Sequence, residues 1–134
     1  IRKLLNELEK EGLNKTRIHK TIRHINRAKL AIDNVVCDAT NQFLFYNNNH
    51  TVAKIRLADF LNYADEVGIR ALSKVLSLIS GKAYPPRFNG LEKIHSSLRR
   101  VKNPENDYIW HNRTLHGCKL ILQGEYIIIS KENL

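Results

Sequence analysis

Apolar residues recur at helical spacing through most of the first hundred residues of the chain. In residues 2–12, leucines fall on one side and charges elsewhere, which predicts a short amphipathic helix that ends at Gly12. Neither glycine nor proline occurs between Gly12 and Gly68. Within this span, the apolar residues at steps of three, four or seven are Ile18, Ile22, Ile25, Ile32, Val36, Ala39 and Phe43. The pattern predicts one helix of about 30 residues, roughly 45 Å long.

The segment NNNH, residues 47–50, predicts the end of this helix. Consecutive asparagines favour turns because their side chains bond to the local backbone. Residues 52–63 then fit a short strand and a short helix equally well. The next pattern, from Asp65 to Gly81, is that of a helix with an acidic start and a glycine stop.

Two prolines in AYPPRFNG, residues 83–90, predict an extended turn, because each proline fixes its own φ and disfavours helix in the residue before it. A last short helix follows, with its apolar face formed by Leu91, Ile94 and Leu98.

From Asp107 the spacing changes to the alternation of strands, predicted at 108–110, 114–122 and 125–129, with Gln123-Gly124 as the hairpin link. One face of the hairpin is assigned Ile121, Ile127 and Ile129, and the other Leu120, Leu122 and Ile128. We therefore expect cover on both faces, one of them from a second copy of the chain or from another domain.

These elements predict a mainly α, α+β fold. Residues 1–50 form a long helical arm, and residues 51–134 form a small domain closed by an antiparallel hairpin or three-stranded meander. The chain starts at Ile1 inside a helical pattern and contains no methionine, so we expect a piece of a longer protein. No apolar run approaches the roughly 18 residues of a membrane span, which predicts a soluble protein without a membrane partner.

The formal charge of +9 on 134 residues favours a polyanionic partner, with nucleic acid as the first choice. Two segments carry the excess: residues 1–34 hold nine basic and four acidic groups, and residues 67–103 hold eight and one. Two distant cysteines without a CxxC partner predict neither a disulfide framework nor a zinc site, and fit a reducing, cytoplasmic setting.

The first basic cluster lies on one face of the long helix, and no acid occurs between Arg17 and Ile32. A face kept only for solubility usually mixes charge signs, so contact with RNA phosphates is the better interpretation. Its members are Arg17, Lys20, Arg23 and Arg27, with His24 beside them. The second cluster consists of Arg87, Lys93, Arg99, Arg100 and Lys102. Tyr84 and Phe88 beside the prolines fit either base stacking or packing.

The candidate chemistry is sparse. SGK at 80–82 lacks the earlier glycine of a phosphate loop, and the six histidines show no metal-ligand spacing, so we assign no metal site and expect the histidines at the surface or facing RNA. Cys118 alternates with Leu120 and Leu122 and is expected to pack as a small apolar residue, while Gly117 is expected to mark a bulge or a close backbone approach in the strand. No catalytic residue is assigned.

Three segments in this order resemble the region that follows the catalytic domain of bacterial tRNA(Ile)-lysidine synthases. They are IRKLLNELEKEGLNKTRIHKTIRHINRAKLAI, GIRALSKVLSLISGKAYPPR and RTLHGCKL. The resemblance implies a parent ligase that uses ATP with magnesium to join L-lysine to the wobble cytidine of tRNA(Ile). The family's Ser-Gly-Gly-x-Asp-Ser motif is absent from these 134 residues, so tRNA binding and scaffolding, without activity of its own, are what carry over. Arg2 matches a basic position before the paired leucines.

Two other functions fit the residues alone. A stand-alone basic helical protein could bind duplex DNA, which requires a compact helix-turn-helix pair. A protein-interaction module could instead dock a partner, or a second copy in a homodimer, on its apolar hairpin.

Overall fold

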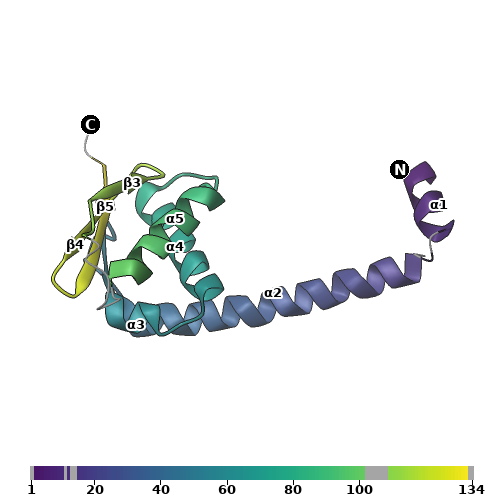
Figure 1. Ribbon diagram of the computed structural model, residues 1–134, viewed down its shortest axis with the longest axis horizontal. Helices are drawn as coiled ribbons and strands as arrows, with labels where there is room; N and C mark the ends of the chain where they lie inside the picture. The colour runs from purple at the N-terminus through teal and green to yellow at the C-terminus, as the bar shows by residue number, and fades with distance from the viewer. Residues whose placement is uncertain (1, 11, 13–14, 102–108, 133–134) are drawn as a thin grey trace. The chain divides into compact units, whose positions relative to one another are not determined.

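The computed structural model describes residues 2–10, 12, 15–101 and 109–132 (Figure 1). Contacts within the chain define two compact units, Ile1–Asn34 and Val35–Leu134. The elements form an α+β protein whose helices accompany a five-stranded antiparallel sheet. We expected a mainly α fold with a hairpin or a three-stranded meander. The α+β class is confirmed, but the sheet has five strands.

Two helices begin the chain. Helix α1 (Arg2–Lys10) is followed by Gly12, whose φ of 96° and N–H bond to the Glu9 carbonyl mark the predicted stop. Helix α2 (Lys15–Phe43) runs for 29 residues, which confirms the single long helix. It ends at Phe43, before the predicted stop at 47–50.

The apolar stripe of α2 is buried only near its C-terminal end. Val36, Ala39 and Phe43 are buried there, and the Phe43 ring meets Phe60 edge-on at 5.3 Å. Ile22 and Ile25, by contrast, are 48% and 61% exposed. Regular spacing thus identified the helix correctly but did not show which part of its apolar face enters a core.

The first hairpin was missing from the sequence prediction. Strand β1 (Leu44–Tyr46) follows α2 directly and pairs with β2 (Val52–Arg56). Asn47 organises the turn: its side-chain oxygen accepts from the backbone N–H groups of Thr51 and Val52 at 2.8 and 3.0 Å. The expected asparagine turn is therefore present, and it joins two strands.

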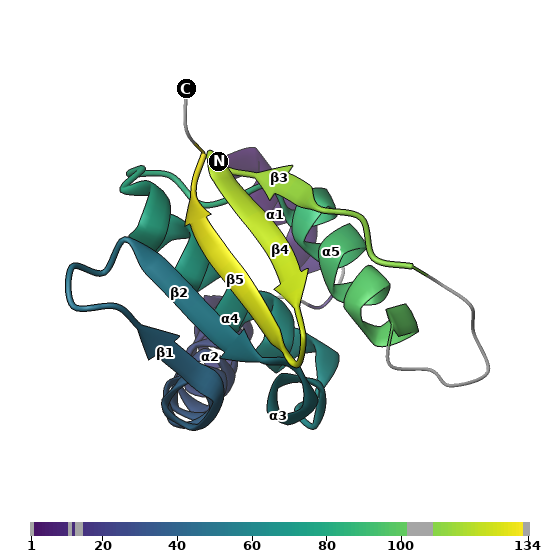
Figure 2. The same ribbon diagram turned by 90° about the vertical axis from the view of Figure 1, so that its left-hand side faces the viewer.

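The ambiguous segment 52–63 contains both elements that it fitted, since β2 leads straight into helix α3 (Leu57–Leu61). Helix α4 (Asp65–Ser80) then ends at Gly81, which has a φ of 72° and donates to the Ser77 carbonyl. Helix α5 (Phe88–Val101) buries Leu91, Ile94 and Leu98, as predicted. Both α4 and α5 lie on one face of the sheet (Figure 2).

The C-terminal strands differ from the prediction at their turns. The expected strand 114–122 is divided into β3 (Arg113–Leu115) and β4 (Cys118–Gln123) by a two-residue turn at His116 and Gly117. Both turn residues have positive φ, 57° and 74°, so Gly117 belongs to a tight hairpin and not to a bulge.

Strand β5 (Tyr126–Lys131) pairs with β4 through the loop Gly124-Glu125, one residue later than predicted. Tyr108 and Lys102 lie outside the described residues, and Ile109 and Trp110 are not in a strand. The predicted strand at 108–110 is therefore absent over its described part.

The sheet order is β1-β2-β5-β4-β3, so the last strand of the chain lies at its centre (Figure 2). Residues directly opposite each other in an antiparallel pair share a face. Leu120 pairs with Ile129 and Leu122 with Ile127, so these four lie on the helix-covered face, and Ile121 shares the other face with Ile128. The predicted division of the hairpin faces was wrong, because in a two-residue hairpin even positions of one strand oppose odd positions of the other.

The core lies between this sheet face and the helices. Its fully buried members include Ile55, Ile127 and Ile129 from the sheet, together with Leu72, Leu76 and Leu98 from α4 and α5. The opposite face is more open: Phe45 is 48% exposed, and Ile121 and Ile128 are half-buried between exposed Lys54 and Lys119. Within the described residues, no helix has the length and apolar character needed to cross a bilayer.

Candidate nucleic-acid interface

The first basic cluster lies on α2 within the unit Ile1–Asn34. Arg17, Lys20, Arg23 and Arg27 are all exposed, as is His24. Their spacing of three, three and four residues places the four cations along one side of the helix. The structure therefore gathers these predicted residues on one solvent-facing surface, as a phosphate-contacting helix requires.

Arg17 also belongs to the joint between α1 and α2. Its Nη1 donates a hydrogen bond to the Gly12 carbonyl at 2.5 Å, and its own carbonyl accepts from the Thr21 hydroxyl at 2.9 Å. Arg2, the remaining candidate in this unit, is exposed on α1. Arg17 thus serves the local structure in addition to any contact with a ligand.

The second cluster is divided by the structure into three environments within the unit Val35–Leu134. Arg87 is exposed beside the prolines and lines a cavity with Lys82 and His116. Lys93 and Arg100 are exposed on α5 and line a polar groove of about 420 Å³, whose other walls are Asn89, Glu92, Ser96, Ser97 and Arg113. Arg99 faces elsewhere, and Lys102 is outside the described residues.

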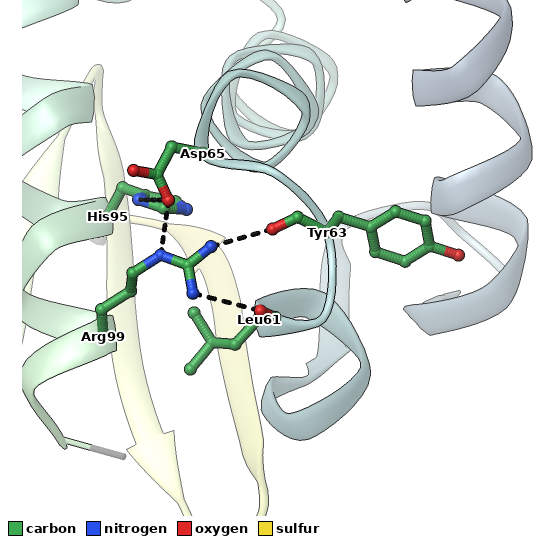
Figure 3. Close-up of polar contacts among 5 residues, drawn as sticks. All are labelled: Leu61, Tyr63, Asp65, His95 and Arg99. Atoms are coloured by element: carbon green, nitrogen blue, oxygen red, sulfur yellow. Dashed lines mark hydrogen bonds and ion pairs between the residues drawn. The ribbon is translucent and has the colours of Figure 1, made fainter. Parts of the chain in front are cut away.

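Arg99 is held by three hydrogen bonds (Figure 3). Its Nε donates to the Asp65 carboxylate at 2.5 Å, and its Nη atoms donate to the carbonyls of Leu61 and Tyr63 at 3.1 and 2.8 Å. These carbonyls lie at the end of α3 and in the link to α4, where helix termination leaves acceptors without intrahelical donors. The geometry thus gives Arg99 a structural role, in tying α5 to the α3–α4 link.

His95 lies beneath the same cluster and is 3% exposed, so the expectation of a surface or RNA-facing histidine is wrong at this position. Its Nδ1 is 3.9 Å from the Asp65 carboxylate, and its ring meets Phe60 edge-on at 5.7 Å. Burial lowers the pKa of His95 below its usual 6.5, and the positive charge of Arg99 lowers it further, while the Asp65 charge acts in the opposite direction. The neutral imidazole is therefore the form that the core favours.

The two cysteines have different surroundings. Cys37 is exposed and Cys118 is fully buried, and neither forms a disulfide. The Cys118 thiol donates to the Leu76 carbonyl at 3.5 Å, and burial raises its pKa. This confirms the prediction that Cys118 packs as a small apolar residue. The part of the chain that the structure describes holds no group of three or more His, Cys, Asp or Glu side chains suited to a metal ion.

Sequence reasoning missed Lys82, His116 and Arg113 as neighbours of the second cluster. Lys82 was considered only as part of a phosphate-loop motif, whereas His116, like the other histidines, was expected at the surface or facing RNA. The available signal was the dipeptide His116-Gly117, because histidine and glycine both tolerate the positive φ of a tight turn. Recognising that turn would have placed His116 at the end of a hairpin.

Comparison with known proteins relates the chain to enzymes of tRNA modification. It is 34% identical over 119 residues to a protein of Wolbachia sp. subsp. Brugia malayi (strain TRS), and 29% identical over 134 residues to a protein of Wolbachia pipientis wMel. Both relatives are named tRNA(Ile)-lysidine synthase. The matches cover 87% and 98% of this chain, so most of it is homologous to part of tRNA(Ile)-lysidine synthase.

The chain spans 26% and 29% of the length of these two relatives. No protein-family profile matches the chain, and no solved structure gives a significant match. The homology agrees with the resemblance carried by the three sequence segments.

Proposed function

We propose that the chain is a tRNA-binding and scaffolding part of a tRNA(Ile)-lysidine synthase, placed after that enzyme's catalytic domain. The observation that carries the proposal is the 34% identity over 87% of the chain to a protein of that name. The parent enzyme would use ATP with magnesium to join L-lysine to the wobble cytidine of tRNA(Ile) in the cytoplasm. Because the chain lacks the expected phosphate-loop motif, we expect it to form no lysidine alone.

The charge distribution supports a binding role. An enzyme that modifies one base of a tRNA must hold a folded molecule much larger than its active site, and contacts to the phosphate backbone position such a substrate. The exposed cations on α2 provide these contacts in one unit, and Arg87, Lys93 and Arg100 provide them in the other. Arg2 adds a further exposed cation on α1.

The test is binding of the 134-residue chain to a tRNA(Ile) transcript, followed by fluorescence anisotropy at several salt concentrations. We expect micromolar or weaker affinity that falls steeply as salt rises. Changing Arg17, Lys20 and Arg23 together to Glu should lower the affinity by at least about tenfold at low salt, because three phosphate contacts become repulsive.

A matched control changes three exposed lysines outside the α2 cluster, Lys54, Lys74 and Lys119, to Glu, with the same change in total charge. We expect this control to lose much less affinity than the α2 variant. Equal losses in the two triple variants, or unchanged tRNA binding by the α2 variant, would contradict the proposed interface. Preferred binding of duplex DNA would favour a DNA-binding protein instead.

A further inference from the structure

A cavity of about 480 Å³ lies where the segment after α4 meets the β3–β4 turn. Lys82, Tyr84 and Arg87 line it from one side, and His116 lines it from the turn. Pro85, Thr114, Leu115, Gly117 and Glu132 complete the walls, and all lie in the unit Val35–Leu134. This volume falls within the range of about 300–1,000 Å³ that is typical of small-molecule sites.

The polar groups around this cavity suit an anion. Lys82 supplies an ammonium group and Arg87 a guanidinium group, whose fork of N–H donors matches the oxygens of a phosphate. Thr114 adds a hydroxyl donor. Glu132 is the acidic residue of the lining, and its backbone N–H is bonded to the Gly117 carbonyl at 2.8 Å, which ties the end of β5 to the turn.

His116 brings a hydrogen-bonding atom whose partner is missing from the described residues. Its Nε2 is buried, and no described side chain or backbone group bonds to it. Buried polar atoms are paired in the great majority of cases. This nitrogen is closed to solvent, however, so it does not face the cavity, and His116 contributes its ring to the cavity wall. The residue also holds a φ of 57°, a conformation that is uncommon outside glycine and is imposed here by the tight turn.

An aromatic ring stands beside these groups. Tyr84 is 61% exposed, and its ring meets the His116 ring edge-on at 5.0 Å. The Lys82 ammonium lies 5.7 Å from the centre of the Tyr84 ring. The two prolines that follow hold the chain extended between Tyr84 and Arg87, so the ring and the guanidinium are held apart in a rigid segment. Exposed aromatic rings next to cations are the usual platform for unpaired bases.

We propose that this cavity binds one nucleotide of a single-stranded RNA segment. Arg87 and Lys82 hold its phosphate, the base stacks on Tyr84, and the His116 ring supports Tyr84 from the turn. The inference rests on the proposed function, because the strand would belong to the RNA substrate. It adds a class of ligand, an unpaired nucleotide, that the cations on α2 do not specify.

The experiment measures binding of a fluorescein-labelled single-stranded hexaribonucleotide to the full 134-residue chain at low salt. We expect Tyr84→Leu and Arg87→Gln each to weaken binding by at least about fivefold, through lost stacking and a lost phosphate contact respectively. Tyr84→Phe keeps the ring and should bind within about twofold of the parent chain. Lys74→Gln removes one exposed charge from α4 outside the cavity and should also stay within about twofold.

Thermal melting of each variant tests whether the exposed substitutions leave the fold intact, and we expect unchanged melting temperatures. The proposal is overturned if Tyr84→Leu binds the hexaribonucleotide as tightly as the parent chain, or if Lys74→Gln loses as much affinity as Arg87→Gln. Inorganic phosphate that competes as well as the labelled RNA would also overturn it, since a base on Tyr84 would then contribute nothing.

The same samples separate this inference from the proposed function. The triple Glu variant of α2 should bind tRNA at least about tenfold more weakly but keep most of its hexaribonucleotide binding. A chain that binds tRNA through α2 yet ignores the hexaribonucleotide would contradict the cavity assignment alone. A chain that binds the hexaribonucleotide but shows no salt-sensitive tRNA binding would contradict the proposed function alone.

Discussion

The Arg99 guanidinium donates a hydrogen bond to the Asp65 carboxylate across 34 residues of sequence. The contact joins α5 to the first turn of α4, where a carboxylate is also favoured by the helix dipole. Arg99 also donates to the carbonyls of Leu61 and Tyr63, so it satisfies acceptors at the C-terminal end of α3 and just beyond it. Arg99, which the sequence placed among the candidates for RNA binding, therefore bonds to groups within the protein.

Replacing Arg99 should therefore affect stability before it affects binding. We expect Arg99→Gln to lower the free energy of unfolding by about 1–2 kcal/mol, because it removes charge-assisted hydrogen bonds at a partly exposed site. Urea denaturation measures this loss, and tRNA affinity of the folded variant should change less than twofold. Lys93→Gln, an exposed change on the same helix, serves as the control and should leave stability within about 0.5 kcal/mol.

The buried His95 should make the stability depend on pH. Because its pKa is lowered in the folded state, the unfolded chain binds more protons below the usual value of 6.5. Stability is then complete above that pH and falls as the pH drops towards the folded-state pKa, with a slope of at most about 1.4 kcal/mol per pH unit for one proton. Urea titrations between pH 5 and 8 should show this fall, and His95→Phe should flatten it. An equal slope in the variant would rule out His95 as its source.

Gly68 should not tolerate a side chain. A Cβ at this position would lie 2.7 Å from His95 Nε2 and 3.1 Å from the Phe60 ring, and both residues are buried. Overpacking of this kind costs typically about 1–3 kcal/mol, so Gly68→Ala should melt at a lower temperature despite the higher helix propensity of alanine. Lys74→Ala changes an exposed position of the same helix and should not lower the melting temperature. A more stable Gly68→Ala chain would show that α4 and α5 can move apart at no cost.

The two cysteines should differ in reactivity. Cys37 is exposed, whereas Cys118 is fully buried and burial raises the pKa of its thiol, so less thiolate is available to react. With iodoacetamide at pH 8, we expect Cys37 to be alkylated at least about tenfold faster than Cys118. Mass spectrometry of the digested protein measures both rates. In denaturant the rates should converge, which provides the internal control.

Much of the helical structure follows from short stretches of sequence. Gly12 and Gly81 stop their helices as predicted, and the acidic pair at Asp65 and Glu66 starts α4. These signals are local, because a helix bonds residues four apart and its caps lie in the flanking turn. The alternation around Cys118 likewise predicted its burial, since neighbouring strand positions point to opposite faces.

The sheet depended on contacts between distant residues. Val52 pairs with Ser130, so β2 is recognisable as a central strand only when β5 lies beside it. The periodicity of residues 52–63 fits both a strand and a helix, because the segment contains one of each, β2 and α3. The faces of the final hairpin, by contrast, follow from the sequence once the link is two residues long, because even positions of one strand then oppose odd positions of the other.

The candidate sites, like the helices and the sheet, combine features set by local sequence with features set by contacts between distant residues. Sequence by itself determined the type of residue available, two groups of cations and an aromatic pair around the prolines, and it determined the long helix that carries the first group. Only the tertiary structure decided that Arg99 is bonded within the fold and that Lys82, Arg87 and His116 line one cavity. Composition and helical spacing act within a few residues, whereas these relationships depend on how α5, the proline segment and the β3–β4 turn pack together.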